Sequence, residues 1–217
     1  MNLSAKEKWR RFRDKMPIVQ KWAFLDHAAC SPLTGQAHDA MARWLEEATN
    51  AGGTAWLGWH ERLQQVRARA AEMVGASPTE IALVRSTTEG ITMIAEGFPW
   101  REGDNVVVPA DEFPSNQYAW MNLASRGVEA RRVAMSEGQL DLDRLDAACD
   151  GRTRIVALSW VGFLSGWRTD LKAAAEVAHR HGALLFVDAI QAFGAFAIDV
   201  QATCVDFFAA GGQKWML

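Results

Sequence analysis

Largely apolar runs that end at a polar residue restrict the fold of this chain more than any other feature. Residues 183–187 read Ala-Leu-Leu-Phe-Val and end at Asp188, and a second such segment, 205–210, leads into a glycine loop that carries Lys214. Strands of this composition are covered on both faces, as in parallel sheets. Amphipathic helical segments separate the runs, so we predict an α/β fold, a mostly parallel central sheet with helices on both faces.

The alternation predicts strands and helices in turn along the chain. We expect strands at 81–85, 105–109, 128–133, 154–160, 183–188 and 206–210. We expect helices at 36–49, 60–74, 88–97, 115–126, 141–149 and 170–181. Residues 1–23 are predicted to form an N-terminal helical segment, and residues 24–217 one large domain.

Composition and charge narrow the classes of partner. The chain has 217 residues and a net charge of -3, with basic residues scattered among acids apart from the stretch 6–15. Neither nucleic acid nor a membrane is therefore an expected partner. The three cysteines, Cys30, Cys149 and Cys204, show no CxxC spacing, so we expect small buried residues, a reducing cytoplasm and no metal site. We find no targeting or membrane-spanning segment.

Asp188, Gln191 and Lys214 carry the strongest chemical signal. A lysine amine condenses with an aldehyde, and a carboxylate beside a pyridine nitrogen keeps that nitrogen protonated, which is what electron-sink catalysis on pyridoxal phosphate requires. Gln191 would then hydrogen-bond the ring hydroxyl. For each residue taken singly, a structural role is the better interpretation: Asp188 as a helix cap and Lys214 as a solvated loop lysine. Their combination with an anion site favours the cofactor.

The anion site is expected at the string Arg85-Ser86-Thr87-Thr88-Glu89-Gly90, which follows a predicted strand and opens a predicted helix. Hydroxyl groups and free amides at a helix N-terminus bind anions. A helix cap, with Glu89 completing a capping box, is an equally good interpretation of this string, and both can hold at once. The string lacks the glycine fingerprint that a nicotinamide-binding domain needs.

Phe113 follows another strand end and is the candidate for stacking on a flat cofactor ring. A loop phenylalanine alone is more often part of a core. In an open parallel sheet, however, ligands collect outside the carboxyl ends of the strands, where Phe113, Thr88 and Asp188 would meet.

Four strings in this order carry a resemblance to a known family: Asp26-His27-Ala28-Ala29, Ser86-Thr87-Thr88-Glu89-Gly90, Val187-Asp188-Ala189-Ile190-Gln191 and Gly212-Gln213-Lys214-Trp215. From about Phe24 to its end the chain resembles the class V aminotransferases. That family is pyridoxal phosphate dependent, has fold type I, and includes cysteine desulfurases, selenocysteine lyases and isopenicillin N epimerase-like proteins.

The resemblance implies a role for each matching residue. The catalytic roles fall on Lys214, as the Schiff-base lysine, and on Asp188, as the partner of the ring nitrogen. The implied cofactor-binding residues are Thr87, Thr88, Phe113, Gln191, Gln213 and Lys214. His27 is the implied substrate contact, although a helix-capping or buried histidine is an equally good interpretation.

The chain also departs from the desulfurase pattern. Phe113 and Gln213 stand where desulfurases have histidines, Gly211 replaces a phosphate-binding serine, and Phe163 replaces an asparagine. These departures favour the epimerase-like branch slightly. The resemblance implies an enzyme acting on the α-carbon of a small amino-acid substrate by lyase, desulfurase, epimerase or transaminase chemistry.

Two further expectations follow from the resemblance. The loop from Gly52 to His60 is similar to one that reaches the neighbouring subunit, which indicates a homodimer. The chain stops at Leu217 within an apolar segment, so the family's small C-terminal domain is expected to be missing. The alternative to an active enzyme is therefore a catalytically incompetent fragment that binds pyridoxal phosphate weakly or not at all.

Overall fold

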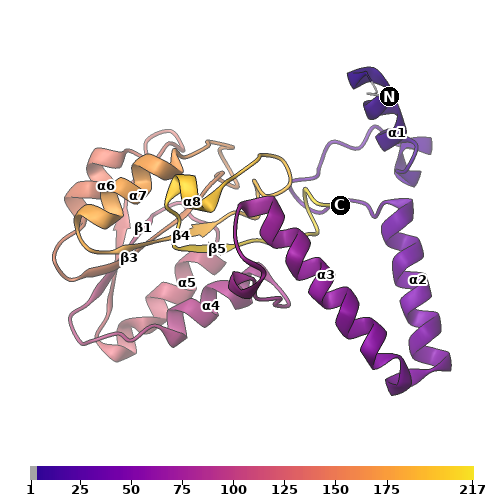
Figure 1. Ribbon diagram of the computed structural model, residues 1–217. Helices are drawn as coiled ribbons and strands as arrows, with labels where there is room; N and C mark the ends of the chain where they lie inside the picture. Colours follow the sequence, from indigo (N-terminus) through magenta and orange to yellow (C-terminus); the bar gives the residue numbers. More distant parts are fainter. Residues whose placement is uncertain (1–3) are drawn as a thin grey trace.

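The computed structural model describes residues 4–217 and contains one five-stranded sheet, all of whose pairings are parallel. The strand order is β2-β1-β3-β4-β5 (Figure 1). The strands are β1 (Asn105–Pro109), β2 (Glu129–Val133), β3 (Thr153–Ser159), β4 (Leu184–Asp188) and β5 (Phe207–Ala209). The α-helices are α1 (Ala5–Arg13), α2 (Gly35–Asn50), α3 (Trp56–Val74), α4 (Thr87–Gly97), α5 (Ser115–Met121), α6 (Leu142–Ala148), α7 (Leu171–Arg180) and α8 (Val200–Thr203).

Helices cover both faces of the sheet, which confirms the predicted α/β class. Side chains alternate along each strand, so neighbouring apolar residues enter opposite cores. Val106 on β1 and Phe186 on β4 pack in the core with α4 and α5, whereas Val107 and Leu185 pack in the core with α6 and α7. Figure 1 shows α4 and α5 on one side of the sheet and α6, α7 and α8 on the other. This two-sided burial explains why the strands read as continuous apolar runs.

The prediction of a strand at 81–85 is wrong. This segment joins the short 3₁₀ helix Pro78–Glu80 to α4 and pairs with no strand within residues 4–217. Leu83 and Val84 are exposed. Apolar, β-branched composition favours an extended chain, but a strand also needs a hydrogen-bonded neighbour, which the sequence pattern does not reveal.

α1 and α2 lie away from the sheet, whereas the C-terminal end of α3 packs in its core through Val74 (Figure 1). α1 carries its own capping box, in which Ser4 and Glu7 bond reciprocally, and lies within the predicted segment 1–23. The boundary at residue 23 stays a prediction. α2 and α3 are joined by a 3₁₀ turn at Gly52–Ala55. None of the helices described is long and apolar enough to cross a membrane.

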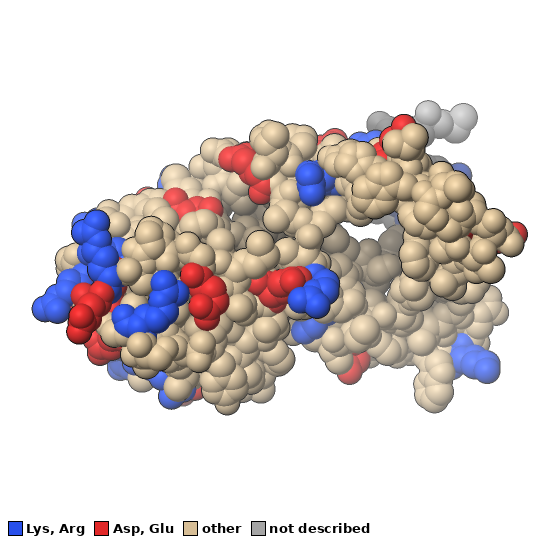
Figure 2. Space-filling view, turned by 90° about the horizontal axis from the view of Figure 1, so that it is seen from below, with Lys and Arg blue, Asp and Glu red and all other residues tan. Residues whose placement is uncertain are grey.

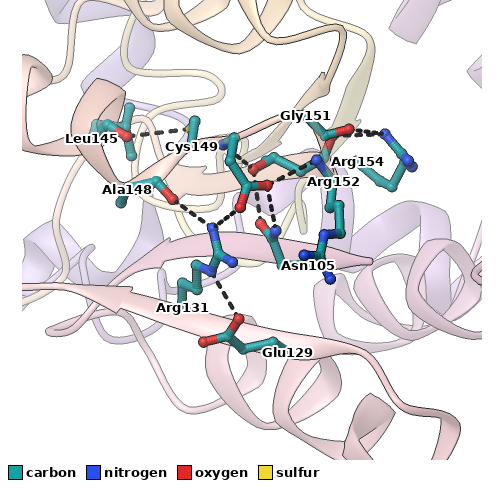
Figure 3. A network of polar contacts seen from close by, with 11 residues as sticks. Asn105, Glu129, Arg131, Leu145, Ala148, Cys149, Gly151, Arg152 and Arg154 are labelled. Atoms are coloured by element: carbon teal, nitrogen blue, oxygen red, sulfur yellow. Dashed lines mark hydrogen bonds and ion pairs between the residues drawn. The ribbon is translucent and has the colours of Figure 1, made fainter. Parts of the chain in front are cut away.

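A polar network ties together the amino ends of the strands (Figure 3). Asn105, which begins β1, donates to Asp150 (3.0 Å) and accepts from the Thr153 hydroxyl (2.8 Å). Arg131 on β2 donates to the other oxygen of Asp150 at 2.8 Å, and this contact holds the pKa of that carboxyl well below its usual range. Because Asn105 and Thr153 are fully buried, the network satisfies groups that would otherwise destabilise the sheet.

The surface carries mixed charge. Figure 2 shows Lys and Arg side chains interspersed with Asp and Glu on the face seen from below. Of the cysteines, Cys149 is buried, and burial raises the pKa of its thiol to about 11. Cys30 and Cys204 are exposed, so the expectation that all three are buried was wrong for these two. Cys30 lies in an irregular segment and Cys204 ends a one-turn helix, and neither position belongs to a core face.

Candidate active site

The predicted catalytic residues lie at one edge of the sheet. Asp188 is the last residue of β4 and pairs in register with Ser159, the last residue of β3. Lys214 follows β5, the neighbour of β4. Parallel strands place all their carboxyl ends at the same edge, which is where open α/β sheets bind ligands.

Asp188 is a buried carboxyl group with few partners. It is 3% exposed, and its Oδ1 accepts a hydrogen bond from the Ile190 amide at 3.0 Å. The pKa of Asp188 is raised to about 6, mainly by burial and also by the nearby Glu112. The hydrogen bond from Ile190 and the charge of Lys214 act in the opposite direction. A carboxyl group in this state gains most from a positively charged partner.

Lys214 is held by the segment that precedes α2. The Ser31 amide donates to the Gln213 carbonyl at 2.8 Å, and the Ser31 hydroxyl donates to the carbonyl of Lys214 itself. Partial burial lowers the pKa of the Lys214 amine, against the opposing charges of Asp188, Cys30 and Asp26. Burial therefore favours the neutral amine, the form that attacks an aldehyde.

Gln191 and His27 lie against the same loop. The Gln191 amide donates to the Ala28 carbonyl (3.1 Å) and accepts from the Trp215 indole (3.4 Å). The ring of His27 stacks on that of Trp215, with 5.7 Å between centroids and 16° between planes. Gln191 therefore links the N-terminal segment to the lysine loop, and His27 packs on Trp215, the residue after Lys214.

The N-terminus of α4 adjoins this edge. Ser86 caps the helix by accepting from the Glu89 amide at 3.1 Å, which confirms the cap. The expected capping box is wrong, because the Glu89 carboxylate accepts from the Arg85 amide instead of the Ser86 amide. Thr88 shares a hydrogen bond with Ser115, the first residue of α5, at 2.7 Å. The hydroxyl of Thr87 is buried and has no hydrogen-bond partner within the described residues. Buried polar groups normally have partners, so an unsatisfied hydroxyl at a helix N-terminus fits a phosphate group.

Phe113 and Phe163 form an aromatic pair beside Asp188's edge of the sheet. Their rings meet edge to face, with 5.2 Å between centroids and 86° between planes. Phe113 remains 45% exposed. A partly exposed aromatic ring at this edge can stack on a flat ligand.

Gln213 folds back over a glycine. A Cβ placed on Gly211 would overlap the Oε1 of Gln213 and lie 3.0 Å from both its Cδ and its Nε2. Glycine at 211 and glutamine at 213 are two departures from the desulfurase pattern, and a side chain at 211 would require the flexible end of Gln213 to move. The site as a whole fits pyridoxal phosphate: a hydroxyl and free amides for phosphate, an aromatic face, a buried carboxyl and an amine.

Sequence reasoning missed Glu112. This residue follows β1, is 8% exposed, and accepts hydrogen bonds from the amide and the hydroxyl of Ser159. The available signal was an acid a few residues beyond a largely apolar strand, a signal similar to the one that identified Asp188. Glu112 also lines a cavity of about 300 Å³ that extends along the Phe163 loop.

The family model for aminotransferase class V matches residues 23–217, and the chain belongs to the class V aminotransferase family. A probable cysteine desulfurase of Methanothermobacter thermautotrophicus is 35% identical over 94% of this chain and 52% of its own length. A cysteine desulfurase of Escherichia coli K12 is 33% identical over 88% of this chain and 50% of its own. The chain thus spans about half the length of the curated relatives that it matches.

Solved structures agree on the fold. The E. coli cysteine desulfurase CsdA superimposes with a TM-score of 0.85 at 26% identity, covering 98% of this chain and 55% of that one. The cystine C-S lyase C-DES superimposes with a TM-score of 0.86 at 23% identity, covering 92% of this chain and 55% of that one. The fold is therefore fold type I, and pyridoxal phosphate, the cofactor expected from the residues, is the cofactor of the family. These comparisons favour the desulfurase branch of the family. They give no support to the epimerase-like branch, which the sequence departures favoured slightly.

Proposed function

We propose that the whole protein is a pyridoxal phosphate enzyme that labilises the α-proton of an amino acid and cleaves a carbon-sulfur bond, with cysteine or a close thio-analogue as substrate. The observation that carries this proposal is the placing of a half-buried lysine and a buried carboxyl group at neighbouring strand ends, beside the unsatisfied Thr87 hydroxyl. The identity of the curated relatives supports the sulfur substrate.

Each residue has a physical task in this proposal. When bound, the cofactor supplies an electron sink for the electron pair of the α-carbon. Asp188 holds its negative charge opposite the ring nitrogen, and the Nζ of Lys214 takes and returns the α-proton. Phe113 covers the ring face, while Thr87, Thr88 and Gln213 hold the phosphate. Gln191 orients toward the ring hydroxyl, and His27 contacts the substrate.

Phe113 gives the proposed chemistry a specific limit. Desulfurases have a histidine at this place, and a phenylalanine cannot donate or accept a proton. Proton transfers near the sulfur must then use another group or water. We therefore expect β-elimination, which yields pyruvate, ammonia and sulfide from cysteine and water, to compete with desulfuration, which yields alanine and transfers sulfur to an acceptor thiol.

The first experiment tests cofactor attachment. The purified chain is titrated with pyridoxal phosphate, its visible absorption recorded, and the mixture reduced with borohydride for peptide mapping. We expect the reduced adduct on Lys214 and its loss in Lys214→Ala, with Lys172→Ala, an exposed lysine on α7, behaving as wild type. An adduct that survives Lys214→Ala would refute the assignment of this lysine. A longer form of the protein, treated in the same way, tests whether this chain alone is an incompetent fragment.

The second experiment tests the reaction. Cysteine is supplied to the full-length protein, and sulfide, pyruvate and alanine are measured in parallel. Sulfide together with pyruvate indicates elimination, and alanine in equal amount to transferred sulfur indicates desulfuration. Racemised cysteine or an amino-group transfer product without sulfur release would overturn the sulfur proposal and favour the epimerase or transaminase alternative.

We also propose that the protein is a homodimer through α2, α3 and the turn between them. Trp44, Trp56 and Leu57 are 48%, 57% and 75% exposed, and tryptophans line a cavity of about 280 Å³ between the two helices. Exposed apolar surface of this kind favours association. Light scattering should give a dimer mass that Leu57→Lys lowers to the monomer. The control Leu164→Lys changes an exposed leucine outside these helices. A monomeric wild type would refute this surface.

A further inference from the structure

Glu112 is a buried carboxyl group that the proposed chemistry does not use. Its Oε1 accepts from the Ser159 amide at 2.6 Å, and its Oε2 accepts from the Ser159 hydroxyl and from the Asn116 side-chain amide at 3.1 Å. A side chain that joins the loop after β1 to the last residue of β3 in this way fixes both to each other. Ionic acceptors make the stronger hydrogen bonds of this kind.

The same contacts continue into the core below α5. The side-chain carbonyl of Asn116 accepts a hydrogen bond from the Trp120 indole at 2.9 Å. Trp120 is fully buried, and its ring lies edge to face with that of Phe186 on β4, with 5.5 Å between centroids. The backbone amide of Asn116 also donates to the Phe113 carbonyl at 2.8 Å. Phe113 therefore lies between two residues, Glu112 and Asn116, that bond to each other and to the sheet. A well-packed support of this kind holds a ring in one position.

Glu112 also lies beside Asp188. Ser159, which binds Glu112 through two groups, is the register partner of Asp188 on the adjacent strand. The two buried carboxyl groups differ in hydrogen bonding: Glu112 has three donors and Asp188 has one, from Ile190. The donors to Glu112 stabilise its negative charge against burial, and a negative charge on Glu112 opposes a second one on Asp188.

We propose that Glu112 is a positioning residue of the cofactor site, which fixes the loop of Phe113 against β3 and places a second negative charge beside Asp188. The inference rests on the proposed function, because it assigns Glu112 a task at the cofactor site. The charged groups that act on Asp188 are Glu112, from the loop after β1, and Lys214, from the loop after β5. Burial raises the pKa of both carboxyl groups, and Glu112 raises that of Asp188 further.

This arrangement has a measurable consequence for the protein without cofactor. Asp188 keeps its proton to a higher pH than an isolated aspartate does, so cofactor affinity falls as the pH drops through the range in which Asp188 is protonated. Glu112→Gln removes the charge but keeps an acceptor for the Ser159 amide. Asp188 in that variant should ionise at lower pH, by about half a unit or more, the effect of a nearby like charge.

The test uses two readouts. The first is the titration of the Asp188 carboxyl carbon by NMR in the protein without cofactor, assigned with Asp188→Asn. The second is the pH dependence of pyridoxal phosphate affinity. Both midpoints should move to lower pH in Glu112→Gln, and Glu112→Ala should in addition weaken cofactor binding at all pH values because the Phe113 loop is released. Asp111→Asn, a neighbouring exposed carboxylate, is the matched control and should move neither midpoint.

The outcomes separate this inference from the proposed function. Unchanged Asp188 titration in Glu112→Gln, with a loss of thermal stability only, would show a merely structural residue and overturn the inference. A shifted NMR midpoint in a protein that binds no pyridoxal phosphate would overturn the cofactor-site role while leaving the pairing of the two carboxyl groups. A shift in both readouts supports the inference as stated.

Discussion

Gly194 is the residue at which a single methyl group should disturb the lysine loop most directly. A Cβ at this position would lie 2.7 Å from the Trp215 carbonyl oxygen and 2.8 Å from its carbon, and the backbone φ is +98°. Left-handed strain costs a non-glycine residue about 1–2 kcal/mol, and overpacking against backbone costs about 1–3 kcal/mol. Gly194→Ala should therefore lower the free energy of unfolding by about 2–5 kcal/mol.

The strained loop should also bind cofactor less well. Trp215 follows Lys214 directly and its indole bonds Gln191, so a displaced Trp215 backbone moves both residues. We expect the affinity for pyridoxal phosphate to fall by about tenfold or more, the equivalent of about 1.4 kcal/mol. Urea unfolding and a cofactor titration followed by absorbance measure the two effects.

Gly182→Ala is the matched control for this prediction. Gly182 has φ +72° and nothing within 4 Å of its Cβ position, so alanine there introduces strain without a clash. It should lose only about 1–2 kcal/mol and bind cofactor as wild type. Equal destabilisation of the two variants, or wild-type cofactor affinity in Gly194→Ala, would refute the reasoning from close approach.

Three other predictions concern the sheet and its edges. Asp188→Asn should stabilise the protein without cofactor above pH 6 by up to about 3 kcal/mol, because folding raises the pKa of this acid to about 6. The wild type becomes less stable by this amount as the pH rises from about 4 to 6, where the buried carboxyl group ionises. Urea unfolding across this pH range measures the difference. Asn105→Ala should cost about 1–3 kcal/mol by leaving buried partners unsatisfied, with cofactor affinity unchanged since Asn105 lies at the opposite edge. Trp120→Phe should cost about 1–3 kcal/mol through the unsatisfied Asn116 carbonyl, and a thermal melt with no change would contradict that hydrogen bond.

The sequence predicted the sheet well where burial alone decides the pattern. β1, β3 and β4 are covered on both faces, so their composition is sufficient to locate them within about two residues. The segment 81–85 has similar composition but lacks a neighbouring strand, and pairing is a property of the tertiary structure. The same limit explains why the position of α2 away from the sheet was not foreseen.

Within the site, the sequence predicted residues better than relations between them. Asp188 was identified because it directly follows an apolar segment, and Lys214 because it lies on the glycine loop after a second such segment. Glu112 was missed because its role depends on Ser159, 47 residues away, to which only the folded chain brings it. The close approach of the Gln213 side chain to Gly211 likewise depends on a side-chain conformation that sequence spacing does not specify.

The hydrogen bond from Ser31 to the Lys214 carbonyl joins residues that are 183 positions apart. Contacts of such long range form late, because the closure of a long loop precedes any gain from the contact. Lys214, the proposed Schiff-base lysine, thus acquires its position only after the segments between residues 31 and 214 have folded around the sheet. During synthesis on a ribosome, the loop that binds the cofactor aldehyde would stay unfolded until synthesis had passed residue 214. Cofactor capture would then report the folding of the sheet and its lysine loop, and a destabilised variant would lose it before losing its secondary structure.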